Sequence, residues 1–515
     1  MVSASVLVAI ACGAPPRAPG TAVIASGADL ESGNPAVTVH PLSRQIQRHA
    51  LFVTLVRLDS MLQPQPYFAR SWSWSGDRRV LTFALHEGLS WHDGMPTTAA
   101  DVRFTLDAVR DSALGSPRAG ELANVDSVRT DGTGSLRVFF RQAPPALPTV
   151  FAELPVVPRH LLDSVPRAAW RGHAFSTAPV GNGPFRFVDR VAGRRWRFAR
   201  NEKFPSELGG PPHLRQLVVA VVDEAATKYA GLVSGELDLA GVSPTMAHLV
   251  KRDPTLALLT PPALFTTVLA FNTSERPFDD ARVRRAVSLS LDRRRIVDAA
   301  VAGYATPAAG AVPPGLPFSD ARVPVHDGAT ADRLLDDAGW RRGADGVRAR
   351  AGAAFVVELL TVGSGDLAVE QLVQADLAAR GITVKIRVAE LAAFLGEVRA
   401  PTKAYDFAFT GIPGDLAMGH LSALFMSSQR GGALDYTAFH DKALDAALEA
   451  ARRADVRSAP LAWQRVDLLL AAETPVAWIY HSRGVQGISR LMSGVHMDLR
   501  GELVSVSQWT RAERK

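Results

Sequence analysis

The chain has 515 residues, of which 47% are hydrophobic and 21% are charged, and its formal net charge is +6 at pH 7. This composition is ordinary for a globular protein long enough for two to four core-forming units, and it excludes a largely disordered chain. The positive charge comes from scattered arginines, with no basic run and no basic helix interleaved with aromatic residues. The sequence therefore gives little support for binding to nucleic acid or to a membrane surface.

The N-terminal segment, MVSASVLVAIACGAPPRAPG, is an apolar stretch that runs into Cys12, the only cysteine, and then into a Pro/Gly-rich tether. This order is typical of a bacterial lipoprotein signal, in which cleavage before the cysteine leaves a lipid-modified N-terminus. We expect residues 1–20 to be a signal and tether, with lipid on Cys12 and the protein outside the cytoplasmic membrane. Because no basic residue precedes the apolar stretch, an unremarkable apolar N-terminus is the alternative. No other segment has the roughly 18 apolar residues of a membrane-spanning helix.

A strand and a helix come next. RRVLTFAL (78–85) alternates apolar and polar residues, which predicts a half-buried strand. TAADVRFTLDAVRD (98–111) has apolar residues at helical spacing, and Thr98 followed by Asp101 predicts a capping box at its start. The intervening segment, HEGLSWHDG (86–94), therefore lies between the end of a strand and the start of a helix.

This intervening segment has the residue types of a metal site but not the spacing. A zinc hydrolase of the HExxH type places two histidines at i and i+4 on a helix, whereas His86 and His92 are six residues apart. Asp93 and Gly94 favour a turn rather than a continuing helix. We therefore expect no metal here, and a metal-dependent hydrolase using His86, Glu87 and His92 is only a remote alternative. The sequence also has no phosphate-binding loop, nucleophile elbow or dinucleotide fingerprint, so we expect no cofactor and no enzymatic activity.

The second half of the chain predicts an α/β unit. FDDARVRRAVSLSLDRRRIVDAAVAG (278–303) predicts two helices in series, capped by Asp279 or Asp280 and by Asp292, and the Pro/Gly-rich residues 311–324 predict a loop. From about 354 to 412 the pattern alternates strand, helix, strand, helix and strand. Such a βαβαβ unit implies a parallel sheet with helices on its faces.

Five segments resemble the bacterial extracellular solute-binding proteins of family 5, the group that contains the oligopeptide-, dipeptide- and nickel-binding components of ABC importers. The longest matches are LTFALHEGLSWHDGMPTTAADV (81–102) and LAFNTSERPFDDARVRRAVSLSLDRRRIVDAAVAGYATPAAGAVPPG (269–315). The others are PVGNGPFRFVDRVAGRRWRFARNEKF (179–204), LVSGELDLAGVSP (232–244) and ALDYTAFHDKALDAALEAARR (433–453). Together they extend over nearly the whole chain beyond the N-terminal segment.

The resemblance implies an α/β fold of the class II periplasmic-binding-protein type, with two lobes, a hinged ligand cleft between them and a third, smaller α+β domain. Lobe I would be discontinuous, and the domain ranges would be 21–50, 165–265 and 482–510 for lobe I, 51–164 for the smaller domain and 266–481 for lobe II.

The resemblance also implies a binding function. The protein would be a monomer that captures a small solute, with a peptide as the expected ligand, and delivers it to the membrane permease subunits of an ABC importer. A nickel chelate, haem, a sugar or an opine is the alternative ligand, because the family binds all of these on one scaffold. A regulator of transcription would carry a helix-turn-helix ahead of such a domain, and the sequence shows none.

The ligand-binding residues that the resemblance implies centre on Asp415. In peptide-binding members, an aspartate in a GWxxDY-type segment pairs with the ligand's α-amino group. The aligned segment here is GIPGDL (411–416), which places Gly414 and Asp415 just beyond a strand, where open α/β sheets tend to bind ligands. Ile412 replaces the usual tryptophan, which weakens the case for peptide specificity. A solvated loop carboxylate is the alternative role for Asp415.

Four further residues are candidates for the cleft. Thr266 and Thr267 lie on the strand that resembles one of the strands crossing between the lobes. Asn34 and His40 lie in the segment after the first strand, where family members often contact ligand. An ordinary structural role is the alternative for each of the four.

Overall fold

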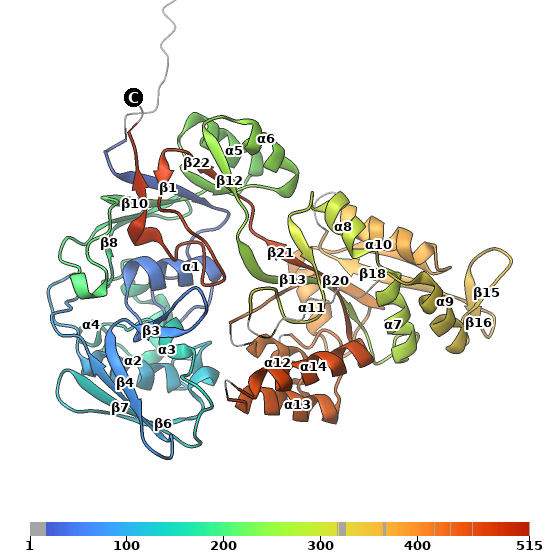
Figure 1. Ribbon diagram of the computed structural model, residues 1–515, viewed down its shortest axis with the longest axis horizontal. Coiled ribbons are helices and arrows are strands. Elements are labelled where there is room, and N and C mark those ends of the chain that lie inside the picture. The colour runs from blue at the N-terminus through green and yellow to red at the C-terminus, as the bar shows by residue number, and fades with distance from the viewer. Residues whose placement is uncertain are drawn as a thin grey trace, which may run out of the picture.

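The computed structural model describes residues 17–316, 318, 326–363, 367–416, 418–432, 434–455 and 457–513. Cys12 lies outside the described residues, as does part of the loop predicted at 311–324. Two large sheets organise the chain, one on each side of Figure 1, and we name the parts built on them lobe I and lobe II. No helix in the described part of the chain is long and apolar enough to cross a membrane.

Lobe I is built on a mixed seven-stranded sheet. Its central strand β1 (Thr21–Ser26) pairs in parallel with its neighbours on both sides, and the outer strands pair antiparallel. The other strands in spatial order are β12 (Leu256–Leu259), β22 (Gln486–Ser489), β11 (Leu239–Gly241), then beyond β1 β10 (Gln216–Val221), β9 (Arg195–Arg200) and β8 (Phe185–Val191). The helices of this lobe are α1 (Pro41–Ile46), η1 (Gln47–Leu51), α5 (Ala225–Ser234) and α6 (Ala247–Arg252). Shorter elements are β2 (Val56–Leu58), β3 (Pro64–Pro66), η5 (Ser206–Leu208), η6 (Pro244–Met246), β23 (Met492–Ser493), η8 (Val506–Gln508) and β24 (Thr510–Arg511).

A smaller α+β part lies below lobe I in Figure 1. Its antiparallel sheet has the order β4 (Ala69–Trp74), β5 (Val80–Leu85), β7 (Ser135–Phe140) and β6 (Val125–Thr130), with α2 (Ala99–Arg110) against it. The remaining helical turns are η2 (Ala119–Leu122), α3 (Val150–Glu153), α4 (Arg159–Leu162), η3 (Arg167–Gly172) and η4 (Ala174–Ser176). The predicted capping box of α2 is confirmed, since Thr98 accepts from the backbone of α2 and Asp101 accepts from the backbone N–H of Thr98.

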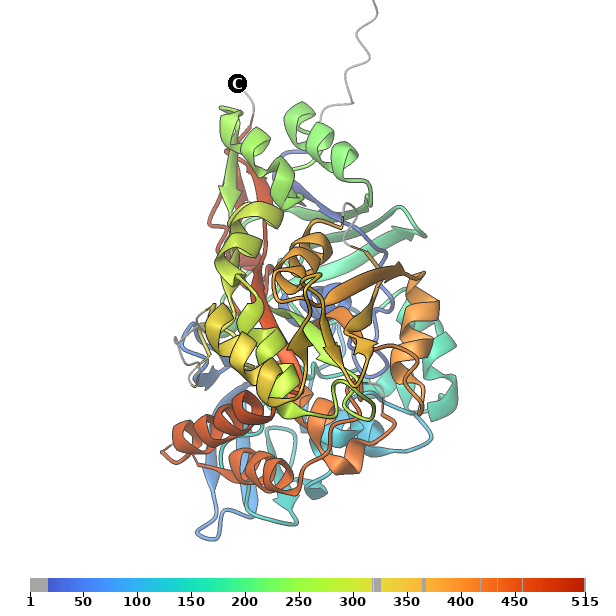
Figure 2. The same ribbon diagram turned by 90° about the vertical axis from the view of Figure 1, so that its right-hand side faces the viewer.

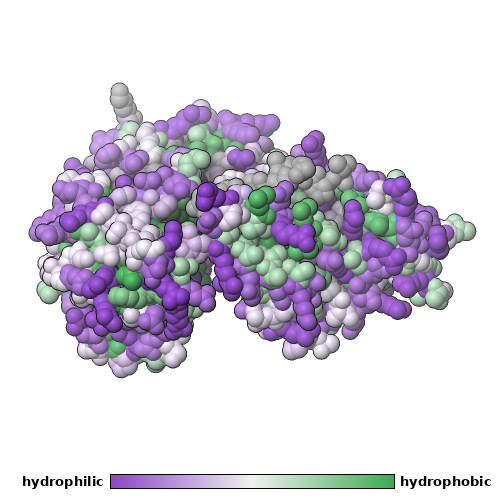
Figure 3. Space-filling view, turned by 60° about the horizontal axis from the view of Figure 1, so that its bottom comes forward, coloured by the Kyte–Doolittle hydropathy of each residue, from purple (hydrophilic) through white to green (hydrophobic). Residues whose placement is uncertain are grey.

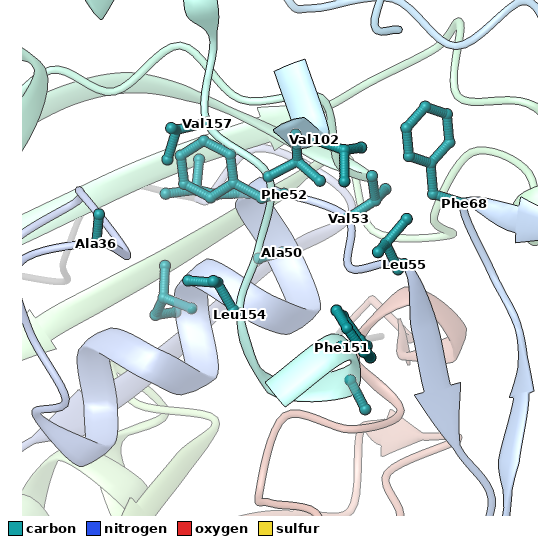
Figure 4. Close-up of a cluster of buried hydrophobic side chains, with 14 of the residues drawn as sticks. Ala36, Ala50, Phe52, Val53, Leu55, Phe68, Val102, Phe151, Leu154 and Val157 are labelled. Atoms are coloured by element: carbon teal, nitrogen blue, oxygen red, sulfur yellow. The ribbon is translucent and has the colours of Figure 1, made fainter. Parts of the chain in front are cut away.

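The smaller part and lobe I share one hydrophobic core. Figure 4 shows Phe52 and Val53, which follow η1, packed among Val102 of α2, Phe151 of α3 and Val157. The VGNGPF segment closes the same junction, because a Cβ atom on Gly181 would lie 1.9 Å from the carbonyl oxygen of Leu51. Gly181 therefore allows the two backbones to approach more closely than any side chain would permit.

Lobe II is built on a six-stranded mixed sheet with helices on both faces, as Figure 2 shows. The strand order is β14 (Ala305–Pro307), β21 (Val476–Arg483), β13 (Pro262–Phe271), β20 (Phe407–Pro413), β18 (Val356–Thr361) and β19 (Thr383–Val388). The predicted βαβαβ unit is confirmed, because β18 pairs in parallel with both β19 and β20.

The helices of lobe II divide between two buried clusters, one on each face of its sheet. One face carries α7 (Ala281–Ser290), α8 (Arg293–Ala300), α9 (Gly328–Asp337) and α10 (Ala368–Ala378). The other carries α11 (Leu391–Arg399), α12 (Gly419–Phe425), α13 (Lys442–Arg453) and α14 (Ala459–Glu473). A small sheet of β15 (Arg341–Arg342), β16 (Arg348–Arg350) and β17 (Ala353–Ala354) and the turn η7 (Ser427–Gln429) complete the lobe. Asp280 and Asp292 cap α7 and α8, so Asp280 rather than Asp279 is the first cap.

The chain crosses between the two large sheets at two adjacent points. One crossing joins β12 to β13 and the other joins β21 to β22. The backbone N–H of Gly484 donates to the carbonyl oxygen of Pro261 at 2.8 Å, and the side chain of Arg483 donates to the carbonyl oxygen of Thr260 at 2.6 Å. These bonds tie the two crossings together as one narrow connection. Figure 3 shows a deep notch between the lobes, which is the cleft considered below.

Candidate functional site

The histidine-rich segment at 86–94 joins the smaller part to lobe I. The Nε2 atom of His92 lies 3.0 Å from the carbonyl oxygen of Gly183, and Nδ1 accepts from the N–H of Gly181 at 3.2 Å. Burial lowers the pKa of His92 to about 4, so the ring is neutral at pH 7. Asp93 contacts His160 at 2.7 Å instead of a neighbouring histidine of the segment. Within the described ranges, no group of three or more His, Cys, Asp or Glu side chains could hold a metal ion.

Asp415 lies in the short loop between β20 and α12 in lobe II. Its carboxylate accepts from the backbone N–H groups of Gly419 at 3.0 Å and His420 at 2.9 Å, and the His420 ring lies 3.3 Å away. Burial acts to raise the pKa of Asp415, but the hydrogen bonds and charge of His420 and the backbone N–H groups outweigh it and lower the pKa to about 2. Asp415 is therefore ionised at neutral pH, and 36% of its side chain is exposed.

Thr266 and Thr267 lie beside this loop on β13. Thr266 pairs with Ile412 of β20 and its hydroxyl lies 2.9 Å from Nδ1 of His481, while Thr267 bonds the phenol of Tyr480. Both threonine side chains are buried. The N–H of Gly414 donates to the carbonyl oxygen of Leu264 at 2.8 Å. The structure therefore brings four of the sequence-predicted residues close together, with Thr266 and Thr267 on β13 and with Gly414 and Asp415 in the loop that follows the paired strand β20.

Asn34 and His40 lie on lobe I, apart from these four. The side chain of Asn34 is fully buried and accepts from the backbone N–H of Ala36 at 3.0 Å, so it shapes the turn that leads to α1. His40 is half-buried and occupies the position before the first residue of α1. Any contact with a ligand from residues 34–40 would therefore come from Val39, from His40 or from the backbone.

Phe265 was not singled out from the sequence, although it adjoins Thr266. Its side chain is 41% exposed, which is unusual for phenylalanine in the middle of a sheet. A Cβ atom on Gly411 would lie 1.9 Å from Cζ of Phe265, so the ring extends over the neighbouring strand β20. The sequence shows only that a phenylalanine precedes Thr266 on the predicted crossing strand, and its exposure depends on the fold.

A charge network on the lobe I side was also missed. Arg44 of α1 and Arg48 of η1 both donate to the buried carboxylate of Glu153, and the guanidinium of Arg118 lies 4.0 Å from the same carboxylate. Arg118, whose side chain is only 2% exposed, also donates to both oxygens of Glu121 at 3.1 and 3.2 Å. No single local motif links these five residues, because they come from three separate segments that only the fold brings together.

The charge of Asp415 contributes to the pKa of two of these residues. Burial raises the pKa of Glu121, the charges of Arg118 and Arg44 oppose that rise, and the negative charge of Asp415 adds to it. Burial lowers the pKa of Arg44, and the charges of Glu121 and Asp415 oppose that change.

Two cavities lie away from Asp415. One, of about 550 Å³, is lined by Arg48, Arg57, Glu153 and Arg500 among others, and none of its lining residues belongs to lobe II. The other, of about 600 Å³, lies between α7 and α14 on lobe II. Neither of these two cavities is lined by Asp415, Thr266 or Thr267.

The model of the bacterial extracellular solute-binding proteins, family 5 (middle), matches residues 63–432. The chain belongs to this family. The match covers more than half of the chain and includes α2, the crossing strand β13 and the loop of Asp415. The resemblance inferred from the sequence motifs is therefore confirmed.

Individual relatives agree with this assignment. The chain is 29% identical to Protein XP55 of Streptomyces lividans over 468 residues, which are 89% of this chain and 83% of that protein. It is 28% identical over 279 residues to a protein of Brucella ovis named as an ABC transporter peptide-binding protein. That second match covers 53% of this chain and about half, 51%, of the Brucella protein.

The expected fold is also confirmed by a solved structure. The oligopeptide-binding protein AppA from Bacillus subtilis, solved in complex with a nonapeptide, superposes with a TM-score of 0.79. The superposition covers 97% of this chain and all of AppA at 22% sequence identity. At that identity the likeness establishes the two-lobed fold of this family 5 binding protein. It does not identify the ligand, which depends on the residues of the site.

Proposed function

We propose that this protein is the substrate-binding component of an ABC importer, which captures a small solute outside the cytoplasmic membrane and delivers it to the permease. The observation that carries the proposal is the pair of adjacent crossings, which are the connection between two lobes that face each other across a cleft. Such a connection allows closure around a ligand. Function then rests on differential affinity of the ligand for the closed state, and no chemical step is required.

We propose a peptide as the ligand, bound by Asp415. An ionised carboxylate that is partly exposed at the cleft can accept a charge-assisted hydrogen bond from an ammonium group. Gly414, Thr266 and Thr267 would form the adjoining wall, and His40 with the backbone near Asn34 would form the opposite one. The Brucella relative named as peptide-binding supports this choice.

We also propose that the domains follow the ranges expected from the sequence, which are 21–50, 165–265 and 482–510 for lobe I, 51–164 for the smaller domain and 266–481 for lobe II. The strands of the two large sheets and of the four-stranded sheet support this division away from its boundaries. Near the boundaries the structure differs, because β2 and β3 lie with lobe I, η3 and η4 lie with the smaller part, and the crossings lie at 260–261 and 484–485. A monomer anchored by lipid on Cys12 completes the proposal. Mass spectrometry of the N-terminal peptide from a bacterial host tests the anchor.

Native mass spectrometry of freshly purified protein, followed by calorimetry with short peptides, tests the peptide proposal. We expect a series of co-purified peptides in the wild type. Asp415→Asn should weaken peptide binding by more than tenfold, because the ammonium loses its charged acceptor. Asp337→Asn, which changes an exposed carboxylate of α9, is the matched control. Recovery of a sugar or a metal chelate, or unchanged affinity in Asp415→Asn, would overturn the peptide assignment.

A further inference from the structure

The lobe I cavity of about 550 Å³ is a pocket of its own, because none of the described residues that line it belongs to lobe II. Its walls are η1 with the β2–β3 hairpin, the end of α3, residues 204–213 and residues 496–508. Sites for small molecules have volumes of roughly 300–1,000 Å³. The cavity is therefore large enough for a small organic molecule, and such a molecule would contact both lobe I and the smaller part.

Two guanidiniums in the lining are held in fixed positions. Arg48 donates to Glu153, to the carbonyl oxygen of Arg500 and, at 3.2 Å, to the ring of His49. Arg500 donates from two nitrogens to Asp498 and from the third, at 2.7 Å, to the carbonyl oxygen of Leu58. A guanidinium has five N–H groups, so these bonds leave further donors on each. Both side chains are mostly buried, so their donors are already oriented for a ligand.

Arg57 and Tyr67 add donors that no other group uses. The guanidinium of Arg57, on β2, lies over the ring of Tyr67 at 5.5 Å, and both residues line the cavity. Within the described ranges, Arg57 makes no ion pair, and its side chain donates no hydrogen bond. Burial raises the pKa of Tyr67 to about 12, so its phenol stays protonated and remains a donor. The cavity therefore presents a guanidinium and a hydroxyl that are both available to a ligand.

Positive charge predominates around the cavity. The lining contains three arginines and two carboxylates, Asp59 and Glu153. Glu153 is shared with Arg44, which lies outside the cavity, and Asp59 accepts from two backbone N–H groups of its own hairpin turn at 2.9 Å. Burial, followed by the charges of three neighbouring arginines, lowers the pKa of Arg48 to about 9. A bound anion would offset this positive charge, and partial burial strengthens that attraction. Three histidines, which add no negative charge, also line the cavity, namely His49, His213 and His496.

We propose that this cavity is a second binding site, for a small organic anion that carries carboxylate or phosphate groups. Arg48, Arg57 and Arg500 would bind its oxygens, because the planar fork of a guanidinium matches both groups, and the Tyr67 hydroxyl would donate a further bond. The inference goes beyond the proposed transport function and does not depend on it, since Asp415 and the threonines of β13 do not line this cavity. An anion bound here would also stabilise the folded state by mass action.

Calorimetry with citrate and with glycerol 3-phosphate, in a buffer free of other oxyanions, tests the inference. Binding of citrate alone would assign a carboxylate ligand, and binding of glycerol 3-phosphate alone would assign a phosphate ligand. We expect Arg57→Gln to weaken binding by about tenfold or more, because the anion loses a guanidinium, and Tyr67→Phe to weaken it by about threefold. Arg129→Gln is the matched control, since Arg129 is an exposed arginine that lies over the Phe139 ring at 5.0 Å on a different sheet.

Thermal unfolding and a cleft variant complete the test. The anion that binds should raise the unfolding midpoint of the wild type in proportion to the logarithm of its concentration, and should raise that of Arg57→Gln less at each concentration. Asp415→Asn should bind the anion like the wild type, because Asp415 is not part of this cavity. Failure of both anions to bind the wild type, or equal affinities in Arg57→Gln and Arg129→Gln, would overturn the inference. Altered anion binding in Asp415→Asn would place the anion in the cleft and would also overturn it. None of these results bears on the peptide proposal, which the peptide titrations test separately.

Discussion

At the scale of single residues, His92 has a structural role although it lies in a segment with the residue types of a metal site. A neutral ring with a proton on Nε2 satisfies both of its contacts, since Nε2 donates to Gly183 and Nδ1 accepts from Gly181. Protonation would place an N–H group against the N–H of Gly181. The folded pKa of about 4 lies below the ordinary value of 6.5, so the unfolded state binds the proton more tightly. Stability from His92 is therefore present above pH 6.5 and declines as the pH falls towards 4.

Urea unfolding at several pH values measures how the stability contributed by His92 depends on pH. We expect the wild type to lose stability between pH 6.5 and 4, and His92→Ala to lose part of that dependence. At pH 7, His92→Ala should cost about 1–3 kcal/mol, because two polar backbone groups lose a partner. His86→Ala, at the other histidine of the segment, is the control. An unchanged pH dependence in His92→Ala would contradict the assignment.

The carboxylate of Asp415 should stay ionised under mildly acidic conditions. Burial acts to raise its pKa, but the hydrogen bonds and charge of His420 and the backbone N–H groups outweigh it and lower the pKa to about 2. We therefore expect the contribution of Asp415 to peptide affinity, measured as the difference between the wild type and Asp415→Asn by calorimetry with trialanine, to be the same at pH 7 and pH 4. A contribution that disappears between these pH values would contradict the assignment.

At the scale of elements, the residues that cap the helix N-termini could be predicted from the sequence, because capping joins residues that are close together in the chain. The capping box of α2 joins residues three positions apart, and Asp280 and Asp292 cap α7 and α8 in the same way. The choice between Asp279 and Asp280 could not be made from the sequence, since either oxygen could reach the first turn. Only the backbone direction after the preceding turn selects Asp280.

The capping box supports a quantitative prediction. Thr98→Ala should lower the free energy of unfolding by about 1 kcal/mol, the usual loss for an N-terminal cap. Asp101→Ala should cost more, because its carboxylate accepts from the backbone N–H groups of both Thr98 and Arg159 and is buried. Urea denaturation measures both changes. Equal losses in the two variants would show that the second bond, to Arg159, contributes nothing.

At the scale of the whole molecule, the lobes touch through apolar side chains as well as through the crossings. Leu62, beyond β2, and Leu499 pack against the core cluster of lobe II that includes Leu316. A Cβ atom on Gly315 would lie 3.1 Å from Cδ1 of Leu499. These contacts therefore add an apolar interface between the two parts of the molecule to the two crossings.

Leu499→Ala should therefore open the molecule. Loss of a partly buried leucine contact is worth about 1 kcal/mol, which is roughly fivefold in the equilibrium between open and closed states. We expect a larger radius of gyration in X-ray scattering of the ligand-free variant and a similar loss of ligand affinity. Leu461→Ala, at a leucine of α14 that is 72% exposed, is the control. An unchanged radius and affinity would show that these contacts do not govern closure.

The sequence by itself determined the family, the two-lobed α/β class, the βαβαβ unit and the structural role of the HDG turn. Each of these depends on residues within about one helical turn of one another or on long contiguous motifs. The tertiary structure alone decided which charged side chains meet. Arg44, Arg118 and Glu153 are separated by 74 and 35 positions in the chain, and they form one charge network only because the fold brings α1, the segment before η2 and α3 together. Electrostatic interaction depends on distance in space and on burial, and neither can be read from spacing along the chain.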